Sequence, residues 1–129
     1  MSKQLIVTSK ADAIKAIDQA KQKAGEEDMA DILDSLNVYY ERQYAYVPGR
    51  KHRADFALWR PGSPLGERMA LVEVTGGVYS KQAHGSITGI LLDNARLNLA
   101  TLVGWRVLRF TPQQVHNGEA RDILERLLA

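Results

Sequence analysis

The chain has 129 residues, a length typical of one domain with a single core. Its 45% hydrophobic and 25% charged residues are ordinary for a globular protein, and the absence of cysteine excludes disulfides and thiolate zinc sites. No apolar run is long enough to span a membrane, and the N-terminus lacks the apolar region of a signal peptide. We therefore expect a soluble, cytoplasmic protein with no membrane partner.

Two helices are expected before the first strand. Ser9 is a candidate N-cap for a helix over residues 10–24, in which Ile14, Ile17 and Ala20 share one face. Gly25 is a plausible C-cap for that helix. A second helix over residues 27–36 has an apolar face of Met29, Ile32, Leu33 and Leu36. Its acidic start suits the helix dipole, or one of these carboxylates reaches a functional site.

Three strands follow, over residues 39–47, 53–59 and 68–75, separated by turns rich in proline and glycine. The third is almost continuously apolar, which is typical of a central strand. The formal net charge is only +2, but basic residues gather around the two ends of the second strand. They are Arg50, Lys51, His52, Arg53 and Arg60. Such a cluster permits a nucleic-acid partner, although a solvated turn explains it equally well.

After a loop over residues 78–88, a helix is expected over residues 88–103. Its predicted buried stripe consists of Leu92, Ala95, Leu99 and Leu102, and a partly polar face carries Gly89, Asp93, Arg96 and Ala100. A strand over residues 105–110 comes next, and Thr111-Pro112 begins a capped helix. A final helix over residues 118–128 is expected to bury Ile123, Leu124, Leu127 and Leu128.

This order of elements indicates an α/β fold. A hairpin followed by a strand, a long helix and another strand predicts a mixed sheet with a parallel crossover and helices on both faces. No repeat or interdomain linker is present, so residues 1–129 are expected to form one domain. Residues 1–25 would be an N-terminal extension with a helix, residues 26–116 the core, and residues 117–129 the C-terminal helix.

Two carboxylates lie inside apolar strands. Asp55 and Glu73 are costly there unless each has a partner or a metal ion. If the strands pair as a hairpin, both carboxylates and the backbone carbonyl of Val74 could bind Mg²⁺, which prefers one or two carboxylates and retains several waters. The alternative is that these acidic residues occupy ordinary edge or surface positions.

Three segments carry a family resemblance: residues 50–57 (RKHRADFA), 72–79 (VEVTGGVY) and 104–112 (GWRVLRFTP), together with His84, Asp93 and Asn98. In this order and spacing they resemble small phage and bacterial proteins of the PD-(D/E)xK nuclease superfamily. Those proteins are relatives of archaeal-type Holliday junction resolvases and very-short-patch repair-like endonucleases. The resemblance covers about residues 39–115.

The resemblance implies a restriction-endonuclease-like core, with a mixed four-stranded sheet flanked by helices. It implies an Mg²⁺-dependent (or Mn²⁺-dependent) DNA endonuclease that hydrolyses phosphodiester bonds, with branched DNA such as a Holliday junction as the preferred substrate in recombination or repair. Asp55 and Glu73 would bind the metal, and Glu27, with Glu26 as its rival, would complete the site from the helix. A homodimer is the natural corollary, since cutting two strands needs two sites.

The chain departs from the family pattern at the catalytic lysine. Thr75 stands two residues after Glu73, where the superfamily has lysine. Arg96 is always protonated and cannot act as a base, but it could steady the phosphate, and Lys81 could orient the attacking water. The expected DNA contacts are Arg50, Lys51, Arg53, Lys81 and His84.

Two other functions stay open. One is a nicking or repair-type endonuclease that acts as a monomer. The other is a catalytically weakened module with a nuclease-like fold that binds DNA or protein, an alternative motivated by Thr75.

Overall fold

The chain forms a mixed four-stranded sheet flanked by helices, which confirms the predicted class of fold. A computed structural model describes residues 9–60, 67–75 and 87–129. The elements in chain order are α1 (Lys10–Ser35), β1 (Tyr39–Ala45), β2 (Arg53–Trp59), β3 (Arg68–Val74), α3 (Ile87–Leu102), β4 (Arg106–Phe110), α4 (Pro112–His116) and α5 (Glu119–Leu128).

The strands lie in the order β1-β2-β3-β4. The pairs β1–β2 and β2–β3 are antiparallel, whereas β3 and β4 are parallel and are connected through α3. The parallel crossover is therefore confirmed. Strand β3 is central, and every residue in it after Arg68 is buried, as its continuous apolar run predicted.

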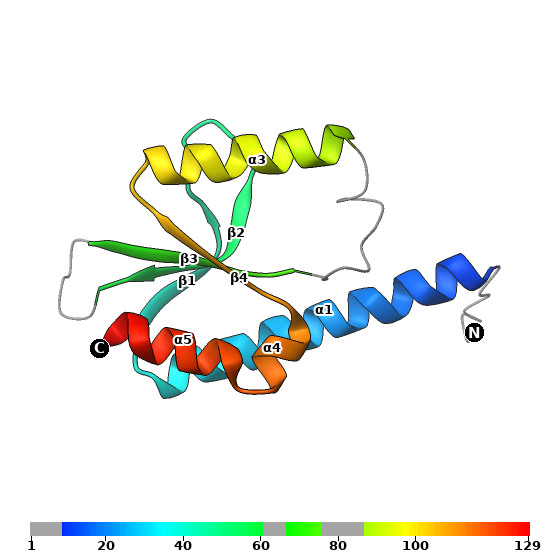
Figure 1. Ribbon diagram of the computed structural model, residues 1–129, viewed down its shortest axis with the longest axis horizontal. Coiled ribbons are helices and arrows are strands. Elements are labelled where there is room, and N and C mark those ends of the chain that lie inside the picture. The colour runs from blue at the N-terminus through cyan, green and yellow to red at the C-terminus, as the bar shows by residue number, and fades with distance from the viewer. Residues whose placement is uncertain (1–8, 61–66, 76–86) are drawn as a thin grey trace, which may run out of the picture.

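Helices cover both faces of the sheet (Figure 1), because side chains alternate between the faces along each strand. On one face, Phe56 and Val72 pack with Met29 and Leu33 of α1 and with Leu124 of α5. On the other face lie Ala57, Leu71, Ala100 of α3 and the indole of Trp105. Among the described helices, none is both long enough and apolar enough to cross a membrane.

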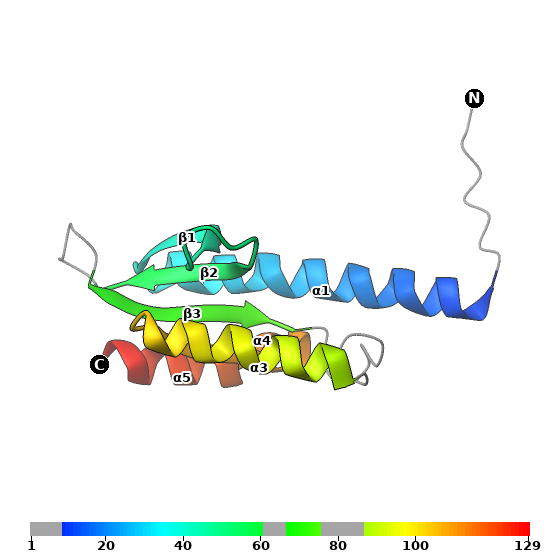
Figure 2. The same ribbon diagram turned by 90° about the horizontal axis from the view of Figure 1, so that it is seen from above.

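Helix α1 is continuous, so the prediction of two helices separated at Gly25 was wrong. Gly25 is buried in the middle of α1. A Cβ atom there would lie 3.0 Å from Val74 Cγ1, 3.1 Å from Pro112 Cβ and 3.2 Å from Pro112 Cα. The glycine therefore permits close packing of the helix on the sheet rather than ending the helix. Beyond this contact, the N-terminal part of α1 extends past the sheet (Figure 2), and Ile14 and Ile17 are exposed.

The predicted buried stripe of α3 was also wrong. Leu92 is 59% exposed and Leu102 is 82% exposed, whereas the face with Asp93, Arg96 and Ala100 lies on the sheet. The helix is oriented this way because Asp93 and Arg96 form ion pairs with side chains of the sheet. Hydrophobic periodicity does not detect such long-range pairs.

Smaller differences occur at the ends of elements. In α5, Ile123 is 41% exposed although it was expected to be buried, while Leu124 is buried. Trp105 precedes β4 rather than belonging to it, but it is buried. The capping of α4 by Thr111 and Gln114 is present as predicted.

Substitution Gly25→Ala tests the close packing of α1. Helix propensity alone favours alanine by about 1 kcal/mol. We expect the opposite sign, a loss of about 1–3 kcal/mol in the free energy of unfolding, because the new methyl group meets Val74 and Pro112. Urea denaturation measures the change in the free energy of unfolding. Ala24→Gly, at the neighbouring exposed position, is the control that gives the effect of helix propensity alone. A Gly25→Ala variant more stable than wild type would contradict the packing role.

Candidate functional site

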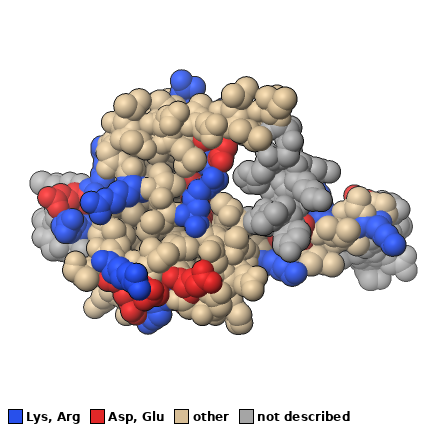
Figure 3. All heavy atoms as spheres, in the orientation of Figure 1, with Lys and Arg blue, Asp and Glu red and all other residues tan. Residues whose placement is uncertain are grey.

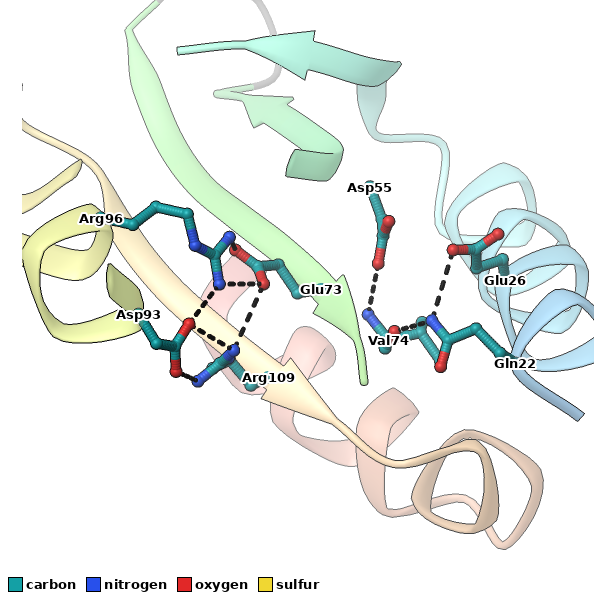
Figure 4. A network of polar contacts seen from close by, with 8 residues as sticks. All are labelled: Gln22, Glu26, Asp55, Glu73, Val74, Asp93, Arg96 and Arg109. Atoms are coloured by element: carbon teal, nitrogen blue, oxygen red, sulfur yellow. Dashed lines mark hydrogen bonds and ion pairs between the residues drawn. The ribbon is translucent and has the colours of Figure 1, made fainter. Parts of the chain in front are cut away.

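The sheet opens at Asp55. Cross-strand pairing between β2 and β3 is regular at Phe56↔Val72 but does not continue to Asp55. Instead, the Asp55 Oδ2 atom accepts a hydrogen bond of 2.8 Å from the backbone N–H of Val74 (Figure 4). On the other side of β2, the position opposite Asp55 is Gln43, which has a positive φ of 51°. The carboxylate thus lies at a fork in the sheet, where it replaces a backbone acceptor.

Two polar side chains of α1 meet the same strand end. The Gln22 Nε2 group donates to the carbonyl of Val74 and lies 3.4 Å from Glu26 Oε1. Gln22 Oε1 is buried and has no hydrogen-bond partner among the described residues. Both side chains flank Gly25, so the close contact at that glycine brings them to Val74. Helical spacing of four residues places them on one face of α1.

The environment of Asp55 disfavours its charge. Burial, and secondarily the nearby carboxylates of Glu26 and Glu73, raise the pKa of Asp55 to about 6, although the hydrogen bond from Val74 acts in the opposite direction. Asp55 of β2 and Glu26 of α1 therefore lie close together, and no basic side chain among the described residues is recorded between them. Such an arrangement favours a proton or a cation.

Glu73 has a different environment, although it is the residue before Val74. It is only 7% exposed and accepts hydrogen bonds from the two terminal guanidinium nitrogens of Arg96, Nη1 and Nη2, at 2.6 and 3.0 Å. Arg96 also donates to Asp93 at 2.7 Å, and Arg109 donates to Asp93 at 2.9 and 3.2 Å. We call Glu73, Asp93, Arg96 and Arg109 the arginine–carboxylate cluster. Its formal charges sum to zero.

The arginine–carboxylate cluster holds Glu73 toward α3, whereas Asp55 lies on the side of α1 (Figure 4). Burial disfavours the charge on Arg96, but hydrogen bonds to Glu73 and Asp93 outweigh it and raise the Arg96 pKa. Burial also acts on Asp93, yet the hydrogen bonds from Arg96 and Arg109 lower its pKa. These groups therefore stay ionised and bound to one another.

The two candidate helix carboxylates have different positions. Glu27 is on the surface, where it pairs with Arg42 at 2.8 Å, and this pairing lowers its pKa. Glu26, the rival, lies beside Asp55. Reading α1 as one helix through Gly25 would have favoured Glu26, because Gln22, Gly25, Glu26 and the buried Met29 share a face. The sequence reasoning also missed Gln22 and Arg109.

The other candidate residues are spread over the molecule. Thr75 is half-buried, and its backbone N–H donates a hydrogen bond of 2.8 Å to the backbone carbonyl of Phe110. Arg50, Lys51 and Arg53 are exposed in the β1–β2 connection and at the start of β2, and Arg53 donates to the carbonyl of Gln43 at 3.0 Å. Lys81 and His84 lie outside the described residues.

The group at Asp55 offers hard oxygen donors. The carboxylates of Asp55 and Glu26 and the carbonyl of Val74 are ligand types that Mg²⁺ and Mn²⁺ accept. Glu73 does not join them in this conformation, and the described residues contain no group of three or more carboxylates or imidazoles arranged to hold a metal ion. The residues therefore offer a divalent cation two protein carboxylates and one backbone carbonyl.

Substitution Asp55→Asn tests the raised pKa. The contribution of Asp55 to folding is fully present below its unfolded pKa of 3.8 and is lost as pH rises through about 6. Asparagine keeps an acceptor for Val74 and carries no charge. We therefore expect the free energy of unfolding at pH 7.5 to be about 1 kcal/mol higher for this variant than for wild type. This value is smaller than the pKa shift alone would give, because solvent screens the partly exposed Asp55. The difference should vanish near pH 4.

Thermal unfolding without divalent cations at both pH values measures this difference, and Asp28→Asn on the exposed side of α1 serves as the control. A variant that is less stable than wild type at pH 7.5 would show that the ionised carboxylate stabilises the fold.

Comparison of the chain with family models, with curated proteins and with solved structures finds no match.

Proposed function

We propose that this protein is a divalent-cation-dependent DNA endonuclease with a restriction-endonuclease-like core. The observation that carries the proposal is the meeting of Asp55 and Glu26 at the strand end of Val74. Carboxylates from a strand and a helix, held around one backbone carbonyl, provide the oxygen donors that such an enzyme needs. The resemblance of residues 50–57, 72–79 and 104–112 to PD-(D/E)xK nucleases supports the same assignment.

Asp55, Glu26 and the Val74 carbonyl would hold Mg²⁺ or Mn²⁺. When bound, this ion neutralises charge on the phosphate oxygens and provides a nucleophilic water at neutral pH. Glu26 therefore takes the role for which Glu27 was the first candidate. Asp55 is fixed by the Val74 N–H and Glu26 by its contact with Gln22, so little reorganisation is needed to bind the cation.

Glu73 is proposed as a conditional third ligand. It can turn toward Asp55 only when it leaves the two nitrogens of Arg96. Once released, the guanidinium of Arg96 could bind a phosphate oxygen in the same fork geometry. Arg96 remains protonated, and the hydroxyl of Thr75 is not a base at neutral pH, so Lys81 stays the proposed residue for orienting water.

Exposed basic residues would bind the DNA backbone. Arg50, Lys51 and Arg53 lie in the chain just before Asp55, which suits contacts to phosphates near the cleaved bond. Lys81 and His84 complete the proposed set. A branched substrate, such as a junction cut by a homodimer, is the preferred proposal because residues 50–57, 72–79 and 104–112 resemble the relatives of junction resolvases.

One observation favours a second candidate function. The engagement of Glu73 by Arg96, together with Thr75 in the lysine position, would suit a module that binds DNA without cutting it. A monomeric nicking enzyme is the third possibility, and the cleavage products distinguish all three.

Cleavage assays with a matched pair of variants test the proposal. We expect wild type to cut a junction with Mg²⁺ or Mn²⁺, and Glu26→Gln and Asp55→Asn each to reduce the rate at least about 100-fold. Glu27→Gln is the control, since its pair with Arg42 is on the surface, and it should keep wild-type activity. Linear duplex, flap and nicked products are scored in parallel.

The outcomes separate the candidates. No cleavage of any DNA with either ion would refute the nuclease. Equal cutting of linear duplex would refute the junction preference. Loss of activity in Glu27→Gln but not in Glu26→Gln would show that Glu27, the first candidate, is the helix carboxylate of the site.

Substitution Arg96→Met tests the conditional role of Glu73. Loss of one partner from a buried ion pair should lower the free energy of unfolding by about 3 kcal/mol. It should also raise the affinity for Mn²⁺ several-fold, because Glu73 then keeps only its longer 3.7 Å pair with Arg109 and can turn toward the cation. Calorimetric titration with Mn²⁺ measures the affinity, and Arg42→Met, which breaks a surface pair, is the control. Unchanged affinity in Arg96→Met would show that Glu73 is purely structural.

A further inference from the structure

The outer side of α3 is an unusual surface. The helix has 16 residues, and its only charged ones, Asp93 and Arg96, both belong to the arginine–carboxylate cluster on the sheet side. The large exposed apolar residues of α3, with exposures from 47% to 82%, are Ile87, Ile90, Leu91, Leu92 and Leu102. Figure 3 shows the surface along this upper edge as mostly uncharged, with a basic group projecting above it. Large apolar side chains exposed along one side of a helix mark a candidate contact surface for another protein.

The absence of charge restricts the occupant. A nucleic acid would require lysine or arginine on this surface, and a charged peptide would require the opposite charge. An isologous contact places each residue against the same surface of a second molecule, so a face without charge avoids like-charge repulsion. The chemistry of this face therefore favours an identical partner.

The order of residues along the face is self-complementary. Apolar residues lie at both ends, and Asn94 and Asn98 occupy the middle, both exposed. In an antiparallel contact whose two-fold axis passes at the height of Arg96, Asn94 lies opposite Asn98 of the second copy. An amide can both donate to and accept from another amide, so the two Asn pairs satisfy each other.

The same axis aligns two apolar residues, Ile90 and Leu102, and places another beside a threonine. Ile90 lies at the height of Leu102 of the second copy, and Leu91 at the height of Thr101. Paired polar residues in an apolar helix contact fix the register, as buried asparagine does in coiled coils.

We propose that α3 is a homodimer interface in which two copies pack antiparallel through their outer faces. The helix is about 24 Å long and about 10 Å wide, which is small compared with the roughly 800 Å² per partner of a standard interface. The dimer should therefore be weak, with a dissociation constant of about 1 μM or more, since even interfaces of standard size extend to the micromolar range. The interface agrees with the two active sites of the proposed endonuclease, but it depends on the surface of α3 alone.

Substitution Leu91→Glu is the first test. It places a charge in the apolar part of the face, and we expect light scattering coupled to size exclusion to give a monomer where wild type gives a dimer at high concentration. Ile17→Glu changes a similarly exposed apolar residue on α1 and should leave the dimer intact. Circular dichroism checks that each variant folds. A wild type that stays monomeric well above micromolar concentration overturns the proposal.

Cross-linking tests the antiparallel register, because the chain has no natural cysteine. Leu91→Cys and Thr101→Cys should form a disulfide when the two variants are mixed and oxidised. Neither should cross-link alone, since two thiols at residue 91 would lie about 15 Å apart along the axis. Cross-linking of Leu91→Cys alone, or none in the mixture, would overturn this register. These tests use no DNA, so their failure is distinct from failure of the nuclease proposal.

Discussion

The contact between α1 and the end of β3 is the constraint on which the candidate site depends. Gly25 lets the helix approach Val74 and Pro112 so closely that a Cβ atom would find its nearest neighbour at 3.0 Å. The residues on either side, Gln22 and Glu26, are thereby brought to the backbone of Val74. Because the N–H of Val74 is already bound to Asp55, a single residue of β3 connects the strand carboxylate to the helix carboxylate. A wider spacing between helix and sheet would separate these two groups, and the sheet itself would be unchanged.

Two neighbouring strands thus place carboxylates in opposite electrostatic environments. Glu73 is surrounded by guanidinium groups, and Asp55 by other carboxylates. The first arrangement also determines the orientation of α3. Asp93 and Arg96 must face the sheet to reach Glu73 and Arg109, and the leucines on the opposite side of the helix are consequently exposed. One buried ion cluster therefore explains the position of Glu73 and the apolar outer surface, features that seem unrelated when the helix is considered alone.

Much of the fold was predictable from local patterns. Strand β2 was predicted with its observed bounds, and the continuous apolar run of β3 indicated its central position. The errors occurred where a contact between distant residues outweighs a local preference. A glycine can end a helix or permit close packing, and only the presence of Val74 and Pro112 decides between these roles for Gly25. The same reason applies to Leu92 and Leu102, which periodicity assigns to the core. Choosing Glu26 over Glu27 requires knowing which residues share a face across Gly25. The prediction of two separate helices removed that information.

The two clusters differ in how their charges balance, and this difference indicates which one is poised for a ligand. In the arginine–carboxylate cluster two cations meet two anions, so the charges balance within the fold, although Arg109 Nε is buried without a hydrogen-bond partner among the described residues. At Asp55, burial and neighbouring carboxylates raise the pKa to about 6, so at neutral pH the ionised group is held at a cost to stability. Gln22 Oε1 is also buried and has no hydrogen-bond partner among the described residues. Unfavourable arrangements of this kind persist where function requires them, and a bound cation would relieve the repulsion between the carboxylates of Asp55 and Glu26. The fork at Asp55, rather than the better-bonded Glu73, is therefore where we propose that a cation binds.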